Sequence, residues 1–118
     1  MPYRIQRYKQ TVTIAAEGTT KADPTTRVLN GYLVGIQADV PALVGTTTLT
    51  LALTDEDGYT LYSKASIAEG AKFTEFADSN NVLRKIPLTG IVTITVTASN
   101  AQTGAAAPIP VVLLIDRG

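Results

Sequence analysis

The sequence contains no cysteine and no histidine, and these two absences exclude several kinds of site. Without cysteine the chain has no disulfide framework, no thiolate nucleophile and no zinc-thiolate centre. Without histidine it lacks the side chain that most often transfers protons near neutral pH and most often binds transition metals. We therefore expect a protein that is not an enzyme and that holds no metal ion and no cofactor.

Tryptophan is also absent, and tyrosine and phenylalanine make up only 6% of the residues. Hydrophobic residues amount to 45%, so the chain can bury a core, but that core must consist mainly of leucine, isoleucine, valine and alanine. A length of 118 residues favours one domain, which we place at residues 1–118.

Neither sign of charge is in excess, because ten basic residues balance ten acidic ones. A neutral chain has no long-range field to attract nucleic acid or an anionic membrane, so we expect neither as a partner. Zero net charge also weakens the repulsion between copies, which suits a protein that enters an assembly. The longest apolar run near the end, Ile109–Ile115, contains Pro110 and is far shorter than the roughly 20 residues of a membrane helix.

The most informative segment is Thr46–Tyr62, in which leucine alternates with threonine and alanine. Leu49, Leu51 and Leu53 would point to one side of a strand, and the residues between them to the other. The turn signal Asp55–Gly58 follows directly, and the alternation resumes after it. Two alternating runs around an Asp-Gly turn predict a β-hairpin.

Short alternating segments separated by turn residues recur along the chain. Beyond the hairpin, we expect one or two strands in residues 3–16 and single strands in four more ranges: 27–40, 82–87, 91–98 and 111–115. We predict a loop at 17–26 and a long connection between two sheets at 63–81, within which Phe73–Ala77 allows one helical turn. The fold class that follows is all-β: a small antiparallel sandwich, jelly-roll-like or barrel-like, with six to eight strands.

The strand at 27–40 contains two glycines that interrupt its pattern. Tyr32 and Ile36 would share one face of this strand, and Leu33 would lie on the other. Gly31 and Gly35 indicate bulges or places where another backbone approaches closely.

Residues 1–16 carry three basic side chains and no acidic one. In one interpretation this segment is an N-terminal docking arm that binds an acidic partner surface through Arg4, Arg7 and Lys9. In the other it is an edge strand whose charges prevent unwanted pairing with other strands.

The segment Val111–Ile115 is apolar on both faces of the predicted strand. Such a strand is either central in its sheet or covered on its second face. A second copy of the protein could supply that cover, so we predict self-association into a dimer or trimer through Val112 and Leu114.

Three patterns have a structural and a functional interpretation. The cluster Asp55-Glu56-Asp57 could wrap a calcium ion, but it lacks the spacing of a calcium loop and suits a solvated turn better. Tyr3, Tyr8 and Tyr32 could stack on nucleic acid, although core or edge positions fit a neutral chain better. Stacking on a sugar would need rings on one face, whereas Tyr59 and Tyr62 fall on opposite faces of their strand.

Taken together, four segments resemble small virion proteins of tailed bacteriophages, and more specifically the decoration or cement proteins of the capsid surface. They are the run GYLVGI (31–36), the hairpin TLTLALTDEDGYTLY (48–62), the turn IPLTG (86–90) and the strand ITVTASN (94–100). The resemblance covers roughly residue 27 to the end.

The resemblance implies a β-sandwich or jelly roll that forms oligomers on the capsid, has no enzymatic activity and stabilises the shell. Its partners would be the major capsid protein and further copies of itself. It would be made in the host cytoplasm and located on the virion surface. The alternatives are a head-completion or tail protein and, outside the virion, a carbohydrate-binding or adhesion module.

Overall fold

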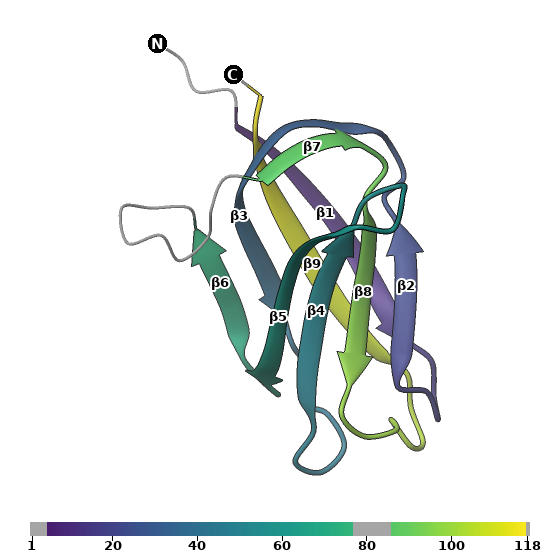
Figure 1. Ribbon diagram of the computed structural model, residues 1–118. Coiled ribbons are helices and arrows are strands. Elements are labelled where there is room, and N and C mark those ends of the chain that lie inside the picture. The colour runs from purple at the N-terminus through teal and green to yellow at the C-terminus, as the bar shows by residue number, and fades with distance from the viewer. Residues whose placement is uncertain (1–4, 77–85, 118) are drawn as a thin grey trace.

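The computed structural model describes residues 5–76 and 86–117, and in these two stretches every regular element is a β-strand (Figure 1). The strands form two antiparallel sheets that face each other. Their bounds are β1 Ile5–Ile14, β2 Thr20–Pro24, β3 Leu29–Asp39, β4 Thr48–Thr54, β5 Thr60–Ala68, β6 Lys72–Phe76, β7 Ile86–Gly90, β8 Thr93–Ala98 and β9 Ala107–Asp116. This arrangement confirms the predicted all-β antiparallel sandwich.

Sheet A contains five strands in the order β1-β9-β3-β6, with β7 also paired to β3. Sheet B contains four strands in the order β2-β8-β4-β5. The central strand of sheet A is β3, which pairs with β9 along one edge and with β7 and then β6 along the other. The first strand of the chain, β1, pairs with the last, β9, over ten consecutive residue pairs.

The described residues contain nine strands, whereas we expected six to eight. One unexpected strand is β2, at a place predicted to be a loop, and another is β6, where the sequence allowed one helical turn. Strand β2 lies at a sheet edge with four of its five residues exposed, so it carries no apolar alternation that the sequence could reveal. Pro24 is compatible with this position because edge strands tolerate proline.

Other element bounds also differ from the prediction. Residues 88–90, predicted as a turn, belong to β7, and residues 82–85 of the predicted 82–87 strand lie outside the described residues. The segment 3–16, expected to hold one or two strands, holds one in its described part, because β1 keeps a regular register with β9. The bulge in β3 is real and lies between Leu33 and Gly35.

The β3 bulge corrects the prediction of which side chains share a face. Leu33 and Ile36 are both fully buried, whereas Tyr32 is 52% exposed. A bulge inserts one extra residue and so shifts the period-two alternation. Before the bulge the odd-numbered side chains point into the core, and after it the even-numbered ones do. A regular alternation, which the sequence pattern assumed, would have placed Tyr32 and Ile36 together.

The core lies between the two sheets and is aliphatic, as the composition predicts. The inward side chains of β4 and β8 face those of β9 across the sandwich. The fully buried residues of these three strands are Leu49, Leu51, Leu53, Ile94, Val96, Ile109, Val111, Leu113 and Ile115. Complete burial of such a side chain contributes roughly 1.5–3 kcal/mol of transfer free energy, which makes these strands the main source of stability.

Gly31 is required where β3 and β9 approach each other closely. Its φ is 130°, and a Cβ atom placed on it would lie 2.5 Å from the carbonyl oxygen of Asp116. The backbone oxygen cannot move aside without breaking the strand pair, so this position admits no side chain.

Tyr62 on β5 is buried with only 9% of its surface exposed, and its hydroxyl has no hydrogen-bond partner of normal geometry among the described residues. Burial raises the pKa of this hydroxyl well above its ordinary value, and the negative charge of Glu75 raises it further. The folded protein therefore holds this proton more tightly than the unfolded chain does.

We expect Gly31→Ala to lower the free energy of unfolding by about 3 kcal/mol, through backbone strain and the clash with Asp116. Urea denaturation measures the change. Gly45→Ala is the matched control, because Gly45 also has a positive φ, of 65°, but has nothing within 4 Å of its would-be Cβ. The control should lose only about 1 kcal/mol. Equal losses of unfolding free energy for the two variants would contradict the close approach of the Asp116 carbonyl to Gly31.

We expect Tyr62→Phe to gain stability relative to wild type as the pH rises above about 10, because it removes the buried hydroxyl whose pKa is raised by burial and by Glu75. Above pH 10 the unfolded wild type releases the tyrosine proton while the folded state retains it, so wild-type stability falls as the pH rises. The variant lacks this contribution, and its advantage should grow between pH 9 and pH 11 in urea titrations. A constant difference across that range would refute the pKa assignment.

Candidate binding face

The described part of the predicted docking arm is an edge strand of sheet A. Side chains at even positions of β1, such as Tyr8 and Val12, point into the core, whereas Arg7 and Lys9 are exposed on the outer side of the sheet. Arg4 lies outside the described residues. Arg7 and Lys9 thus project from a strand that is paired with β9 along its whole length.

Strand β9 lies between β1 and β3, which places the second predicted set of residues beside the first (Figure 1). Val112 is directly opposite Lys9 in the register, and Leu114 is opposite Arg7. On its other side Val112 pairs with Gln37, which in turn pairs with Thr74 of β6. The basic and the apolar residues that the sequence singled out therefore form one surface.

We call this surface the basic face. It comprises these outward residues of β1, β9, β3 and β6: Arg7, Lys9, Pro110, Val112, Leu114, Gln37, Asp39, Lys72 and Thr74; the outward Asp116 lies beyond Leu114 on β9, opposite Ile5.

The two-sided apolar character of β9 has an explanation within one chain. Val112 is only 7% exposed and Leu114 is partly buried, because both lie between neighbouring strands of the same sheet. The central position foreseen for such a strand is thus observed. Self-association through Val112 and Leu114 stays a prediction.

A shallow hollow of about 300 Å³ lies within the basic face. Its apolar surface comes from Pro110 and Val112; Phe73, which also lines it, alternates with the outward Lys72 and Thr74 and packs against the core. Three cations and one carboxylate also line it, so its formal charge is +2; they are Arg7, Lys9, Lys72 and Asp39.

One of these cations is already paired. The Lys72 Nζ lies 3.3 Å from an Asp39 carboxylate oxygen, and both side chains are mostly exposed, so this pair contributes little stability. Arg7 and Lys9 therefore account for the excess positive charge of the hollow.

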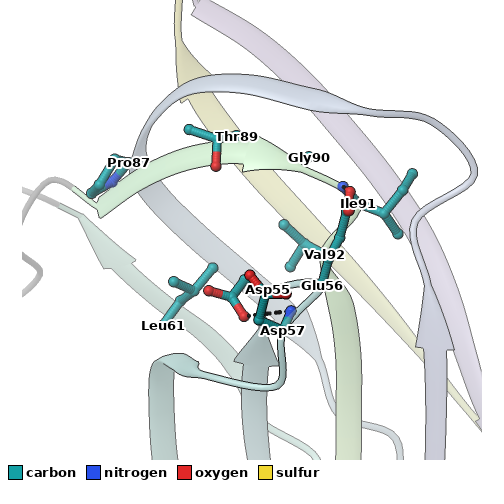
Figure 2. A pocket seen from close by; sticks show the side chains of 9 residues that line it. All are labelled: Asp55, Glu56, Asp57, Leu61, Pro87, Thr89, Gly90, Ile91 and Val92. Atoms are coloured by element: carbon teal, nitrogen blue, oxygen red, sulfur yellow. Dashed lines mark hydrogen bonds between the residues drawn. The ribbon is translucent and has the colours of Figure 1, made fainter.

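The acidic cluster forms the turn between β4 and β5, as the sequence predicted, and two of its carboxylates bind the protein's own backbone (Figure 2). Asp55 Oδ1 accepts hydrogen bonds from the backbone N–H of Asp57 at 3.0 Å and of Tyr59 at 2.9 Å. Glu56 Oε1 accepts the N–H of Ile91 at 2.8 Å. These contacts explain the cluster as turn structure, and the described part of the chain has no group of three acidic side chains arranged to hold a metal ion.

Glu56 joins this turn to the segment between β7 and β8. Figure 2 shows the side chain of Glu56 extending towards Ile91 beside a small depression of about 120 Å³. A Cβ atom on Gly90 would lie only 2.4 Å from Glu56 Oε1, so the glycine leaves room for the carboxylate. We call this contact the Glu56 clasp.

Among the described residues, Tyr8 and Tyr32 do not form a nucleic-acid stacking platform. Tyr8 is buried, its hydroxyl accepts the N–H of Thr26 at 2.8 Å, and the guanidinium of Arg27 lies 5.1 Å from its ring centre. Tyr32 is exposed, and Tyr3 lies outside the described residues. This result agrees with the core position predicted for at least one of the three.

The other two tyrosines differ in exposure, as their positions predicted. Tyr59 is 71% exposed at the end of the turn, whereas Tyr62 is buried. They cannot form a pair of stacking rings for a sugar.

Sequence reasoning missed a buried amide that organises one end of the sandwich. Gln102 is 2% exposed, its Oε1 accepts the N–H of Val44 at 3.1 Å, and its Nε2 donates to the carbonyl of Asn100 at 3.0 Å. Its backbone also exchanges hydrogen bonds with the turn at Glu17 and Gly18. The surrounding segment, Ser99–Ala107, showed only small turn residues, so no pattern identified this role.

The chain matches no protein-family model and no curated protein sequence. Its fold, however, is similar to that of a chain described as part of the capsid asymmetric unit of cyanophage Pam1. That likeness has a TM-score of 0.65 and 18% identity, and it covers 98% of this chain and 86% of the capsid chain. The two proteins therefore share one sandwich fold over nearly their whole lengths.

Two further likenesses are weaker. The VP2 subviral particle of infectious bursal disease virus gives a TM-score of 0.42 at 16% identity, over 98% of this chain and 33% of that chain. A carbohydrate-binding module, CBM36 in complex with calcium and xylotriose, gives 0.43 at 12% identity, over 91% and 87%. Neither is strong enough to support a functional argument. In the described residues there is also no helix long and apolar enough to cross a membrane.

We expect Glu56→Ala and Gly90→Ala each to lower the free energy of unfolding by about 1 kcal/mol, because each removes the Glu56 clasp. The double variant should lose clearly less than the sum of the two single losses, since both remove the same hydrogen bond. Urea denaturation of the four proteins gives the coupling. Glu56→Gln keeps an acceptor oxygen and serves as the control. Fully additive losses would show that the clasp contributes nothing.

Proposed function

We propose that this chain is a non-enzymatic virion protein that binds the outer surface of a tailed-phage capsid and stabilises the shell, as a cement or decoration protein does. The observation that carries the proposal is the basic face, where Arg7 and Lys9 on one side and the Lys72–Asp39 pair on the other flank the apolar residues Pro110 and Val112. A charged rim around an apolar centre is the composition of a protein-binding surface.

The likeness to the cyanophage capsid chain supports the virion assignment by analogy of fold. Because the match covers 86% of that chain, a single sandwich of this kind makes up most of one polypeptide in that capsid unit. A protein of this size and shape is therefore compatible with a place in a shell.

Several carboxylates have structural contacts, which supports the non-enzymatic part of the proposal. Asp55 and Glu56 accept backbone hydrogen bonds, Asp39 pairs with Lys72, and Asp23 lies 3.7 Å from Lys21. A hydrolase with two catalytic carboxylates would instead need a pair facing each other across a substrate groove.

The proposed mechanism is mass action. A protein that binds the assembled shell, but not its dissociated subunits, stabilises the shell by its binding free energy, which amounts to about 2.7 kcal/mol per site at a hundredfold excess over the Kd. Arg7 and Lys9 provide the proposed contacts with the major capsid protein, with Arg4 as a third candidate. Copies would be made in the host cytoplasm and bind at equivalent positions on the shell.

The test uses shells of the phage that encodes this chain, prepared without the protein. We expect the purified protein to co-sediment with these shells in a saturable and salt-sensitive manner and to raise the temperature at which they break open. Shells that neither bind the protein nor gain heat resistance would refute the proposal. A rise in the protein's own Tm with a soluble oligosaccharide, without shell binding, would favour the carbohydrate-binding alternative.

A further inference from the structure

The basic face combines two features that together define a partner's chemistry. Its hollow has an apolar surface, formed by Pro110 and Val112, and the cations Arg7 and Lys9 line the same hollow. A neutral apolar partner would leave Arg7 and Lys9 without counter-charges, and a purely acidic one would leave the apolar surface uncovered. The face therefore fits a segment that is acidic and also presents an apolar side chain.

A second copy of the same face is a poor occupant. Contact around a two-fold axis brings the same patch of both molecules together, so two hollows of charge +2 would face each other. Like charges in an interface are unfavourable by several kcal/mol. This repulsion weighs against self-association through Val112 and Leu114.

The acidic turn of a second copy is also a poor occupant. Two of its three carboxylates, those of Asp55 and Glu56, already accept hydrogen bonds from their own backbone, so these side chains would have to give up contacts of their own turn to reorient towards a partner. Contact between two different patches moreover forms open chains unless its rotation closes a ring.

Given the proposed function, we infer that the basic face binds an acidic segment of the capsid protein that places one apolar side chain in the hollow beside Val112. The segment's carboxylates face Arg7 and Lys9 on β1, the outermost strand of the sheet. Lys72 stays paired with Asp39 on the opposite side of the hollow. The register row Lys9–Val112–Gln37–Thr74 runs across four strands and forms the middle of this site.

The first experiment reverses the charges. We expect the double variant Arg7→Glu/Lys9→Glu to bind shells at least tenfold more weakly than wild type and to lose most of the salt sensitivity of binding. The matched control is Lys21→Glu/Lys64→Glu, which makes the same charge change on strands of sheet B and should bind like wild type. Unfolding in urea checks that both variants are folded.

The second experiment blocks the hollow without changing its charge. Thr74 is exposed on β6 and lines the hollow, so Thr74→Trp should fill part of it and weaken shell binding about tenfold. Thr95→Trp places the same ring on the outer face of sheet B and should have no effect on shell binding. Equal binding by the two tryptophan variants would exclude the hollow as the site.

The third experiment identifies the partner's chemistry. A carbodiimide joins an amine directly to a carboxylate in contact with it, so treatment of protein-bound shells should link Lys9 to an aspartate or glutamate of the capsid protein. Mass spectrometry locates the link. A link from Lys9 to Asp57 of a second copy would overturn the inference in favour of self-association.

These results separate the inference from the function on which it rests. Failure of the wild-type protein to bind shells would refute the proposed function. Shell binding that survives both Arg7→Glu/Lys9→Glu and Thr74→Trp would refute only the role of the basic face.

Discussion

The structure depends on the antiparallel pairing of β9 with β1 on one side and β3 on the other. This pairing joins the last strand of the chain to the first, and it completes sheet A. It also places Ile109, Val111, Leu113 and Ile115 in the core, opposite the leucines of β4. The requirement for glycine at position 31 follows from the same close contact, because any side chain there would meet the carbonyl of Asp116. Loss of this pairing would open the core and separate the two halves of the basic face at once.

One strand thus serves both stability and the proposed recognition. The inward side chains of β9 contribute hydrophobic free energy, while Val112 and Leu114 on its outer side lie between the cations of β1 and the polar residues of β3. A binding surface built on paired strands is rigid, so little conformational entropy is lost when a partner binds. The loops contribute to stability instead, since the side chains of Glu56 and Gln102 form hydrogen bonds that hold turns against the sandwich.

The sequence predicted those elements whose side chains alternate strictly between core and solvent. Strand β4, the Asp-Gly turn, the start of β5 up to Tyr62 and strand β8 belong to this group, because an apolar residue at every second position of β4 and β8 leaves one arrangement for burial. Residues 63–68 of β5, predicted as part of a connection, show no such alternation. The sequence did not predict β2 or β6 as strands. Strand β2 is held at the edge of its sheet by backbone hydrogen bonds, and its side chains bury little. Its sequence therefore shows no apolar alternation from which a strand could be predicted. The bulge in β3 was foreseen through Gly35, but its effect on which residues face inward was not.

By itself, the sequence determined the all-β class, the aliphatic core and the turn at Asp55–Gly58, since local alternation and turn chemistry depend on neighbouring residues. It also identified Arg7, Lys9, Val112 and Leu114 as candidates, but as two separate sets. Only the tertiary structure decided that they are one surface, because pairing between residues at opposite ends of the chain sets Lys9 beside Val112 and Arg7 beside Leu114. The register between strands from opposite ends of the chain is set by the packing of the whole core, so it cannot be predicted from a local sequence pattern.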